Sequence, residues 1–215
     1  MANTHIVEFA VFHGADEATI KNRAVAASKV AGLVAQYGGQ KIEDPAESVH
    51  ITVWRTADSR KKFATSHQTN HAPLVVEILG VEESDNAKLI GALESPTTEV
   101  FTGYDALQSA FAAAVRTFTS AVDAQPPKGY HGAAVMETVE DVALSPTAAE
   151  AAPALISWVG SAVKLIIGWT SREAHLEAKA QPGPIQTNIG LLQDGRKASD
   201  LYHVKFQKLD SPTSE

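Results

Sequence analysis

Residues 163–170 read VKLIIGWT, and the polar run SREAHL follows them at residues 171–176. Residues 48–56 read SVHITVWRT, and the polar run ADSRKKF follows them at residues 57–63. Each stretch is rich in β-branched residues, has a tryptophan near its end and then changes to a helix-forming composition, which is typical of a strand followed by a helix. Two copies of one strand-to-helix unit predict that the chain contains a duplicated domain.

Flanking segments extend both copies into the same order of elements. Apolar periodicity and turn residues predict a first half with strands over residues 4–13, 41–44, 49–56 and 87–93 and helices over 17–37, 57–67 and 71–79. They predict a second half with strands over residues 97–104, 130–137, 163–170 and 201–206 and helices over 105–124 and 171–181. Residues 141–161 have no counterpart in the first half and are expected to form an Ala-rich, helical insertion.

The predicted order, β-α-β-β-α-β twice, is that of the ferredoxin-like unit. Such a unit forms a four-stranded antiparallel sheet with helices on one face, and its other face must be covered. We therefore expect an α+β fold of two ferredoxin-like repeats that pack sheet to sheet as an α+β barrel. The first repeat would span residues 1–95 and the second residues 96–215, with the insertion at about 141–161. A monomer would then be sufficient to close one barrel.

Composition excludes several classes of protein. The 215 residues contain no cysteine, which rules out disulfides, thiolate catalysis and cysteine-based zinc sites. The net charge of −7 argues against a nucleic-acid-binding surface. The N-terminus lacks the basic-then-apolar pattern of a signal peptide, and the most apolar window, residues 154–169, is too short and too interrupted to span a bilayer. We expect a cytoplasmic protein that binds neither nucleic acid nor membrane.

Residues 169–175, WTSREAH, resemble the W-x-S-x-E-A-H signature between the third strand and second helix of the dimeric α+β barrel superfamily. This superfamily includes antibiotic-biosynthesis-monooxygenase-like and stress-responsive barrel domains. Residues 201–206, LYHVKF, are similar to the closing strand of many members, whereas the first copy keeps Trp54 and Thr56 but lacks the Glu-Ala-His. The resemblance implies a single-chain equivalent of the usual homodimer, present as a monomer or as a homodimer. Members include cofactor-free oxygenases, polyketide cyclases, lyases, haem-degrading enzymes and proteins without known activity.

Strand alternation divides the side chains into two faces. The aliphatic and aromatic set is expected under the helices: Val49, Ile51 and Val53 of the third strand, with Tyr202, Val204 and Phe206 of the last. The mixed set is expected to face the barrel cavity: His50, Thr52 and Trp54 of the third strand, with His203 and Lys205 of the last. Glu8 and Glu99 occupy equivalent mid-strand positions and are expected to face the barrel or solvent.

The cavity-facing set predicts acid–base chemistry, since a His or Glu in an apolar barrel can exchange protons near neutral pH. We predict His50 and His203 as acid and base, with Glu8 or Glu99 orienting them or sharing the proton. The predicted substrate contacts are Trp54, Trp169, Thr52, Phe101 and His131. Simpler alternatives stay open, because tryptophans at strand ends pack in cores, glutamates pair with cations across a sheet and His175 fits a structural role.

We expect neither a metal nor a bound cofactor. His67 and His71 have i, i+4 spacing but lack the intervening Glu of a zincin helix, and no phosphate loop or dinucleotide glycine pattern occurs. A histidine could serve as an axial haem ligand, but nothing in the sequence selects that use.

Three functions are compatible with these observations. The first is a cofactor-independent enzyme of secondary metabolism that acts on a small apolar, aromatic or polyketide-like metabolite by cyclisation, isomerisation, elimination, decarboxylation or oxygenation. The resemblance supplies this substrate class. The alternative is a non-catalytic small-molecule-binding or stress-response barrel protein, and an interaction scaffold built on residues 141–161 is a third. Because His50 aligns with Leu165 when the tryptophans are superposed, we expect one half to supply the chemistry.

Overall fold

The computed structural model describes residues 4–15, 17–66, 72–104, 108–155 and 157–209. The first part of the chain forms β1 (Thr4–His13), α1 (Glu17–Ser28), β2 (Leu33–Gln40), β3 (Glu47–Trp54), α2 (Ala57–Ser66), β4 (Val75–Glu82), α3 (Glu83–Leu93) and β5 (Thr97–Tyr104). The rest forms α4 (Gln108–Ala124), β6 (Tyr130–Thr138), β7 (Val142–Ala143), α5 (Pro146–Ala151), β8 (Val159–Gly160), β9 (Ala162–Trp169), α6 (Arg172–Ala180), α7 (Pro184–Asn188), β10 (Ala198–Val204) and β11 (Gln207–Lys208). Short 3-10 turns lie at Pro153–Leu155 and Ile189–Leu192. The fold is a mixed α+β fold around a strongly curled antiparallel sheet.

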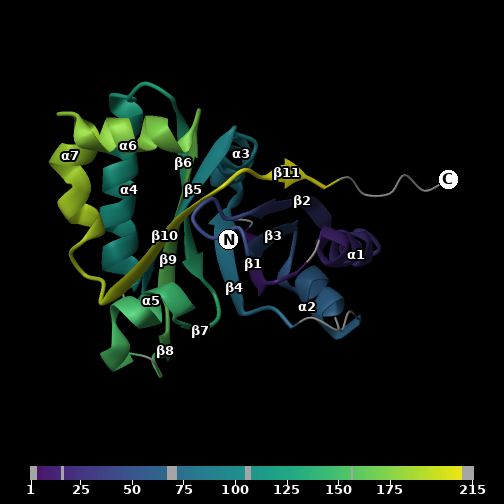
Figure 1. Cartoon of the computed structure of the whole chain (residues 1–215). Helices are drawn as coiled ribbons and strands as arrows, with labels where there is room; N and C mark the ends of the chain where they lie inside the picture. Colours follow the sequence, from purple (N-terminus) through teal and green to yellow (C-terminus); the bar gives the residue numbers. More distant parts are fainter. Residues whose placement is uncertain (1–3, 16, 67–71, 105–107, 156, 210–215) are drawn as a thin grey trace.

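The main sheet has nine strands in the order β10-β5-β9-β6-β4-β1-β3-β2-β11. Helices α1 and α2 lie on one side of the molecule, and α4, α6 and α7 lie on the opposite side (Figure 1). The two strands at the ends of this order, β10 and β11, are almost consecutive in the chain, so one C-terminal segment pairs with both edges of the sheet. This segment crosses the molecule as a long yellow trace (Figure 1).

The seam between β2 and the C-terminal segment is held by close backbone contacts. Lys41 forms a β-bridge with Val204, and the amide of Ile42 donates to the carbonyl of His203 at 2.8 Å. A Cβ on Gly39 would lie 2.6 Å from Val204 Cγ1 and 2.7 Å from the carbonyl oxygen of Lys205. Glycine at this position is therefore needed for the two segments to approach.

Most predicted elements are confirmed within a few residues, but two assignments in the first half are exchanged. Residues 71–79 were expected to be helical, and Val75–Glu82 instead forms β4, with Glu77, Leu79 and Val81 alternating toward the interior. Residues 87–93 were expected to be a strand, and Glu83–Leu93 forms helix α3. Leu89, Ala92 and Leu93 are buried at the i, i+3, i+4 spacing of a helix, which outweighs the short apolar run that suggested a strand.

Two further boundaries differ from the sequence prediction. Helix α1 ends at Ser28 and not at residue 37, because the chain turns at Gly32 with a φ of 96° and begins β2 at Leu33. The strand predicted at residues 41–44 is wrong: the second strand is β2, and of these residues only Lys41 forms an isolated β-bridge. The insertion at 141–161 is only partly helical, since β7 and β8 form a two-stranded sheet on either side of α5.

The predicted orientation of the strand faces is reversed. Val49, Ile51 and Val53 belong to the apolar core inside the curled sheet, together with Tyr202 and Val204, and with Phe206 packed against it. Trp54 instead packs against Phe63 of α2, with ring centroids 5.3 Å apart. The physical reason is that the interior of a tightly curled sheet is filled by aliphatic side chains, whereas the helices cover the outer face and supply charged partners for its polar residues.

The described residues pack the interior with apolar side chains and do not form the predicted substrate cavity there. One end of the interior contains the buried ion pair between Lys164 and Glu77 at 2.7 Å, beside a cavity of about 10 Å³. That volume is about one water molecule. His50 and His203 both lie outside this interior, in the layer between sheet and helices.

No helix in the described part of the chain is long and apolar enough to cross a membrane. His67 and His71, considered above as a metal pair, fall outside the described residues.

Candidate functional site

Two buried polar clusters lie between the sheet and its helices, one in each half of the chain. Glu8 on β1 and Glu99 on β5 are their central carboxyl groups, and both side chains are almost fully buried. The helix residue that faces each carboxyl group lies six positions after a tryptophan: Arg60 after Trp54, and His175 after Trp169. The same layout thus carries different chemistry in the two halves.

In the first half, the carboxyl group is held by two arginines. Arg23 of α1 forms a short ion pair with Glu8 Oε1, and Arg60 Nε of α2 donates to Glu8 Oε2 at 2.8 Å. Arg23 Nε also donates to His50 Nδ1 at 3.1 Å. We call Glu8, Arg23, His50 and Arg60 the arginine cluster. Its carboxylate is engaged by guanidinium groups on both oxygens and is almost fully buried.

In the second half, polar contacts connect four titratable side chains in series: hydrogen bonds as far as His175, and an ion-pair contact from His175 to Glu99. Glu43, just after β2, accepts from the backbone amide of His203 at 2.8 Å and lies 2.7 Å from His203 Nδ1. His203 Nε2 is 2.8 Å from His175 Nδ1, which is 3.5 Å from Glu99 Oε2. Trp169 Nε1 donates to the same Glu99 oxygen at 2.8 Å. We call Glu43, His203, His175 and Glu99 the relay.

Local structure positions the imidazole of His175. Ser171 is the N-cap of α6 and accepts from the amide of Ala174 at 3.2 Å, which fixes the first turn directly after β9. His175 then lies back over Trp169, with the rings stacked 5.2 Å apart at 24°. The helix therefore delivers its histidine onto the strand that carries the tryptophan.

Burial sets the protonation of the relay. It raises the pKa of Glu99 to about 7, against the opposing effect of the Trp169 hydrogen bond. It lowers the pKa of His175 to about 4, helped by the neighbouring His203, and it also lowers the pKa of His203. At neutral pH both imidazoles are therefore uncharged, and Glu99 is poised between its two protonation states.

Glu43 behaves in the opposite way at the outer end of the relay. Burial alone would raise the pKa of Glu43, but hydrogen bonds from His203 and Arg172 hold it below its usual range. Arg172 Nε donates to Glu43 Oε1 at 3.0 Å. Because Glu43 is one-third exposed, it is an ionised acceptor near the surface, whereas Glu99 is a buried acid at the other end.

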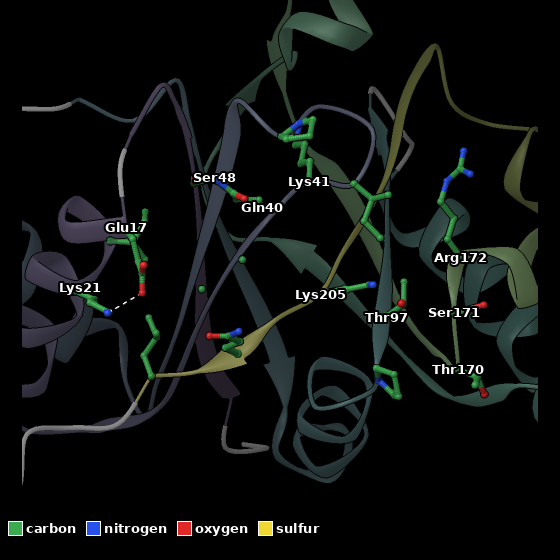
Figure 2. A pocket seen from close by; sticks show the side chains of 18 of the residues that line it. Glu17, Lys21, Gln40, Lys41, Ser48, Thr97, Thr170, Ser171, Arg172 and Lys205 are labelled. Carbon is green, nitrogen blue, oxygen red and sulfur yellow. Dashed lines mark ion pairs between the residues drawn. The ribbon is translucent and has the colours of Figure 1, made fainter.

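A cavity of about 730 Å³ adjoins this outer end. Figure 2 shows Thr97 and Arg172 on one side, Glu17 and Lys21 on the other, and Lys205 of the C-terminal segment between them. The volume is suitable for a drug-sized ligand. Arg172 lines the cavity and also contacts Glu43, so it joins the cavity wall to the relay.

The structure places the predicted site residues in separate groups. Glu99, His203 and Trp169 meet in the relay, whereas Glu8 and His50 meet in the arginine cluster, with Thr52 and Trp54 on the same face of β3. No single pocket between Trp54 and Trp169 is formed by the described residues. Phe101 packs in the core beneath α4, and exposed His131 bonds to Thr170 Oγ1 at 3.2 Å.

Sequence reasoning missed Glu43 and Arg172 and assigned His175 a structural role. The signal for His175 was present, because a histidine in the first turns of a helix that directly follows a buried strand folds back over that strand. For Glu43 no local signal existed. Its partner His203 lies 160 residues away, and the two meet only through the seam.

Solved structures share this fold. An anthrone oxidase-like protein superposes with a TM-score of 0.62 at 13% identity, covering 98% of this chain and 95% of that one. A predicted monooxygenase of Fusobacterium nucleatum subsp. nucleatum gives 0.55 at 11% identity over 98% and 94% of the two chains. A predicted monooxygenase of Lactobacillus acidophilus gives a TM-score of 0.52 at 10% identity, covering 96% of this chain and 95% of that one. No family model and no curated protein matches the sequence. The chain is thus similar to monooxygenase-type α+β proteins at the level of the fold.

Proposed function

We propose that this protein is a cofactor-independent enzyme that removes a proton from a small organic substrate held in the 730 Å³ cavity. The observation that carries the proposal is the relay. It begins at Glu43, which Arg172 joins to the cavity wall, and it ends at a buried carboxyl group with a pKa of about 7. A general acid or base is most effective when its pKa lies near the working pH. Removal of a proton is also a first step shared by isomerisation, cyclisation, elimination and oxygenation.

Each residue has a distinct part in this proposal. Glu43 accepts the C–H or O–H proton of the substrate, and Arg172 stabilises the negative charge that develops on the substrate oxygen. His203 and His175 connect Glu43 to Glu99, which takes up or returns a proton at neutral pH. The name of the anthrone oxidase-like neighbour suggests a polycyclic ketone with an acidic C–H as a first test substrate.

We further propose that the chain consists of two ferredoxin-like repeats, residues 1–95 and 96–215, that close one barrel as a monomer. Two observations support this. The sub-orders β4-β1-β3-β2 and β10-β5-β9-β6 follow one pattern, and Glu8 and Glu99 stand at matching positions. The second repeat then supplies the relay, and the first supplies Glu43 across the seam.

Hydrogen–deuterium exchange at carbon tests the acid–base chemistry without knowledge of the full reaction. Anthrone in deuterated buffer under nitrogen is followed by proton NMR at its acidic carbon. We expect the protein to accelerate exchange above buffer, and Glu43→Gln and His203→Gln to reduce the acceleration by about 10²–10⁴-fold. His13→Gln, at the exposed end of β1, is the matched control and should retain it.

Oxygen consumption after admission of air then shows whether the deprotonated ring is oxygenated. If anthrone binds in the cavity but exchanges no faster than in buffer, the catalytic assignment fails. The non-catalytic binding protein would then be the better description, and Arg172→Gln would be expected to weaken binding without any effect on exchange.

A further inference from the structure

The cavity of about 730 Å³ beside the relay combines apolar side chains with charged ones. It lies at the seam, so both halves of the chain and the C-terminal segment line it. The apolar part of its lining comes from Ile20, Ile42, Pro45, Pro96 and Leu209. A ligand that fills this space therefore has a mainly apolar body, and the charged side chains decide which polar groups it carries.

Three of the four cations that line this cavity, among the residues that the structure describes, are already paired with carboxylates. These ion pairs are Lys21–Glu17 at 2.6 Å, Lys41–Glu47 at 2.5 Å and Arg172–Glu43 at 3.0 Å. Lys205 is the fourth cation, and it forms no ion pair with a described residue. Its ammonium group is therefore the one that a ligand can pair with while the existing ion pairs stay intact.

The backbone of the seam fixes the position of Lys205. The residue follows β10 directly, and its carbonyl oxygen would lie only 2.7 Å from a Cβ placed on Gly39. Figure 2 shows the Lys205 side chain in the middle of the cavity, directed toward the side that carries Thr97 and Arg172. A ligand group bound to Lys205 would thus lie on the side of the cavity that Arg172 joins to the relay.

Glu173, an exposed carboxylate in the first turn of α6, also lines the cavity. Hydrogen bonds from its own backbone amide and from Ser171 lower the pKa of Glu173, and the charge of Lys205 has a smaller effect. The Glu173 carboxylate is therefore held by its own helix turn and is screened by solvent. It leaves Lys205 available to a carboxylate that a ligand brings into the cavity.

We propose that the substrate is a mainly apolar carboxylate, whose carboxylate group pairs with Lys205 while its reacting carbonyl oxygen faces Arg172. The compact ammonium charge of Lys205 attracts the carboxylate, and the two contacts together orient the substrate. Lys205 is then a specificity-determining residue, whereas the relay carries the chemistry. This inference rests on the proposed function for the term substrate, but the preference for a carboxylate can be measured without any reaction.

Two unreactive ligands of nearly the same shape test this preference. The ligands 2-naphthoate and 2-naphthamide differ in charge, and isothermal titration calorimetry at pH 7.5 and low ionic strength gives their affinities. We expect wild type to bind 2-naphthoate about fivefold more tightly than 2-naphthamide, and Lys205→Gln to bind both equally. Lys205→Arg should keep the preference. Lys21→Gln is the matched control, because this cavity lysine is exposed and paired with Glu17, and it should also keep the preference.

Three results would overturn the inference: equal affinities of wild type for the two ligands, no binding of 2-naphthoate at millimolar concentration, or a preference that survives Lys205→Gln. Hydrogen–deuterium exchange of anthrone and of anthrone-2-carboxylate separates this inference from the proposed function. If anthrone exchange is accelerated but 2-naphthoate is not preferred, the catalysis stands and the carboxylate specificity fails. If Lys205 selects 2-naphthoate but neither anthrone exchanges faster than in buffer, the specificity stands for a ligand and the catalysis fails.

Discussion

Glu8 and Glu99 show how partners, and not position, decide what a buried carboxyl group does. Each lies in the middle of its strand, on the face of the sheet that the helices cover. Glu8 is paired with two guanidinium groups, whereas Glu99 meets one indole N–H and a neutral imidazole. Without a cation in contact, burial dominates and the pKa of Glu99 rises to about 7. The two carboxyl groups differ because the residue six positions after the tryptophan is an arginine in the first half and a histidine in the second.

The relay predicts a pH dependence of stability in which two contributions oppose each other. The pKa of Glu99 is raised from 4.5 to about 7, so its contribution is full below pH 4.5 and is lost as the pH rises through 7. The pKa of His175 is lowered from 6.5 to about 4, so its contribution is full above pH 6.5 and is lost as the pH falls through 4. Each is on the order of 3 kcal/mol.

Replacement of Glu99 should therefore expose the histidine contribution. We expect the unfolding free energy of Glu99→Gln, measured by urea denaturation, to rise between pH 4 and pH 6.5 more steeply than that of wild type. The difference between the two proteins should change by on the order of 3 kcal/mol between pH 4.5 and pH 7. Glu17→Gln at the exposed start of α1 is the control, and parallel curves for Glu99→Gln and wild type would contradict the assignment.

At the scale of elements, the sequence identifies most strands and helices because their periodicity is long and regular. Helix α4 and strands β1, β5 and β9 are of this kind. Prediction from sequence fails at residues 71–93, because the short apolar runs there are compatible with both helical and strand periodicity. Only packing against the interior makes the first run strand β4 and the second helix α3. The pattern of polar residues within apolar strands singles out Glu99 and His203, which the structure brings together in the relay. The direction in which they face was not predictable, because it depends on which side of the sheet closes on itself.

Helix caps provide a prediction at this scale. Ser145 caps α5 by accepting from the amide of Ala148, and its hydroxyl also donates to buried Asp200 at 2.8 Å. Ser171 caps α6 and accepts from Ala174 at 3.2 Å. We expect Ser145→Ala to cost about 2–3 kcal/mol and Ser171→Ala about 1 kcal/mol, since only the first also removes a donor from a buried carboxylate. Chemical denaturation of both variants checks the order, and equal losses would contradict it.

For the whole molecule, the seam is the feature that completes both the sheet and the relay. It brings Glu43 to His203 and requires close approach at Gly39. Gly39→Ala should lower the unfolding free energy by roughly 1–3 kcal/mol, because the facing backbone of Lys205 cannot move aside. Exchange of the Ile42 amide, which bonds to His203, should become faster.

Gly91 in α3 is a matched control for this variant. A Cβ there meets nothing within 4 Å, so Gly91→Ala should raise the unfolding free energy by about 0.5–1 kcal/mol through helix propensity alone. If Gly39→Ala were as stable as wild type and the Ile42 amide equally protected, the seam would be less important than its contacts imply.

The position of the closing segment in the chain has a consequence for protein synthesis. On the ribosome, residues 198–208 emerge after every other strand of the main sheet has been made. Until then the nascent sheet has two unpaired edges, along β5 and β2, which can pair with other chains. The interval between translation of β9 and release of this segment is therefore when the growing polypeptide depends most on chaperones.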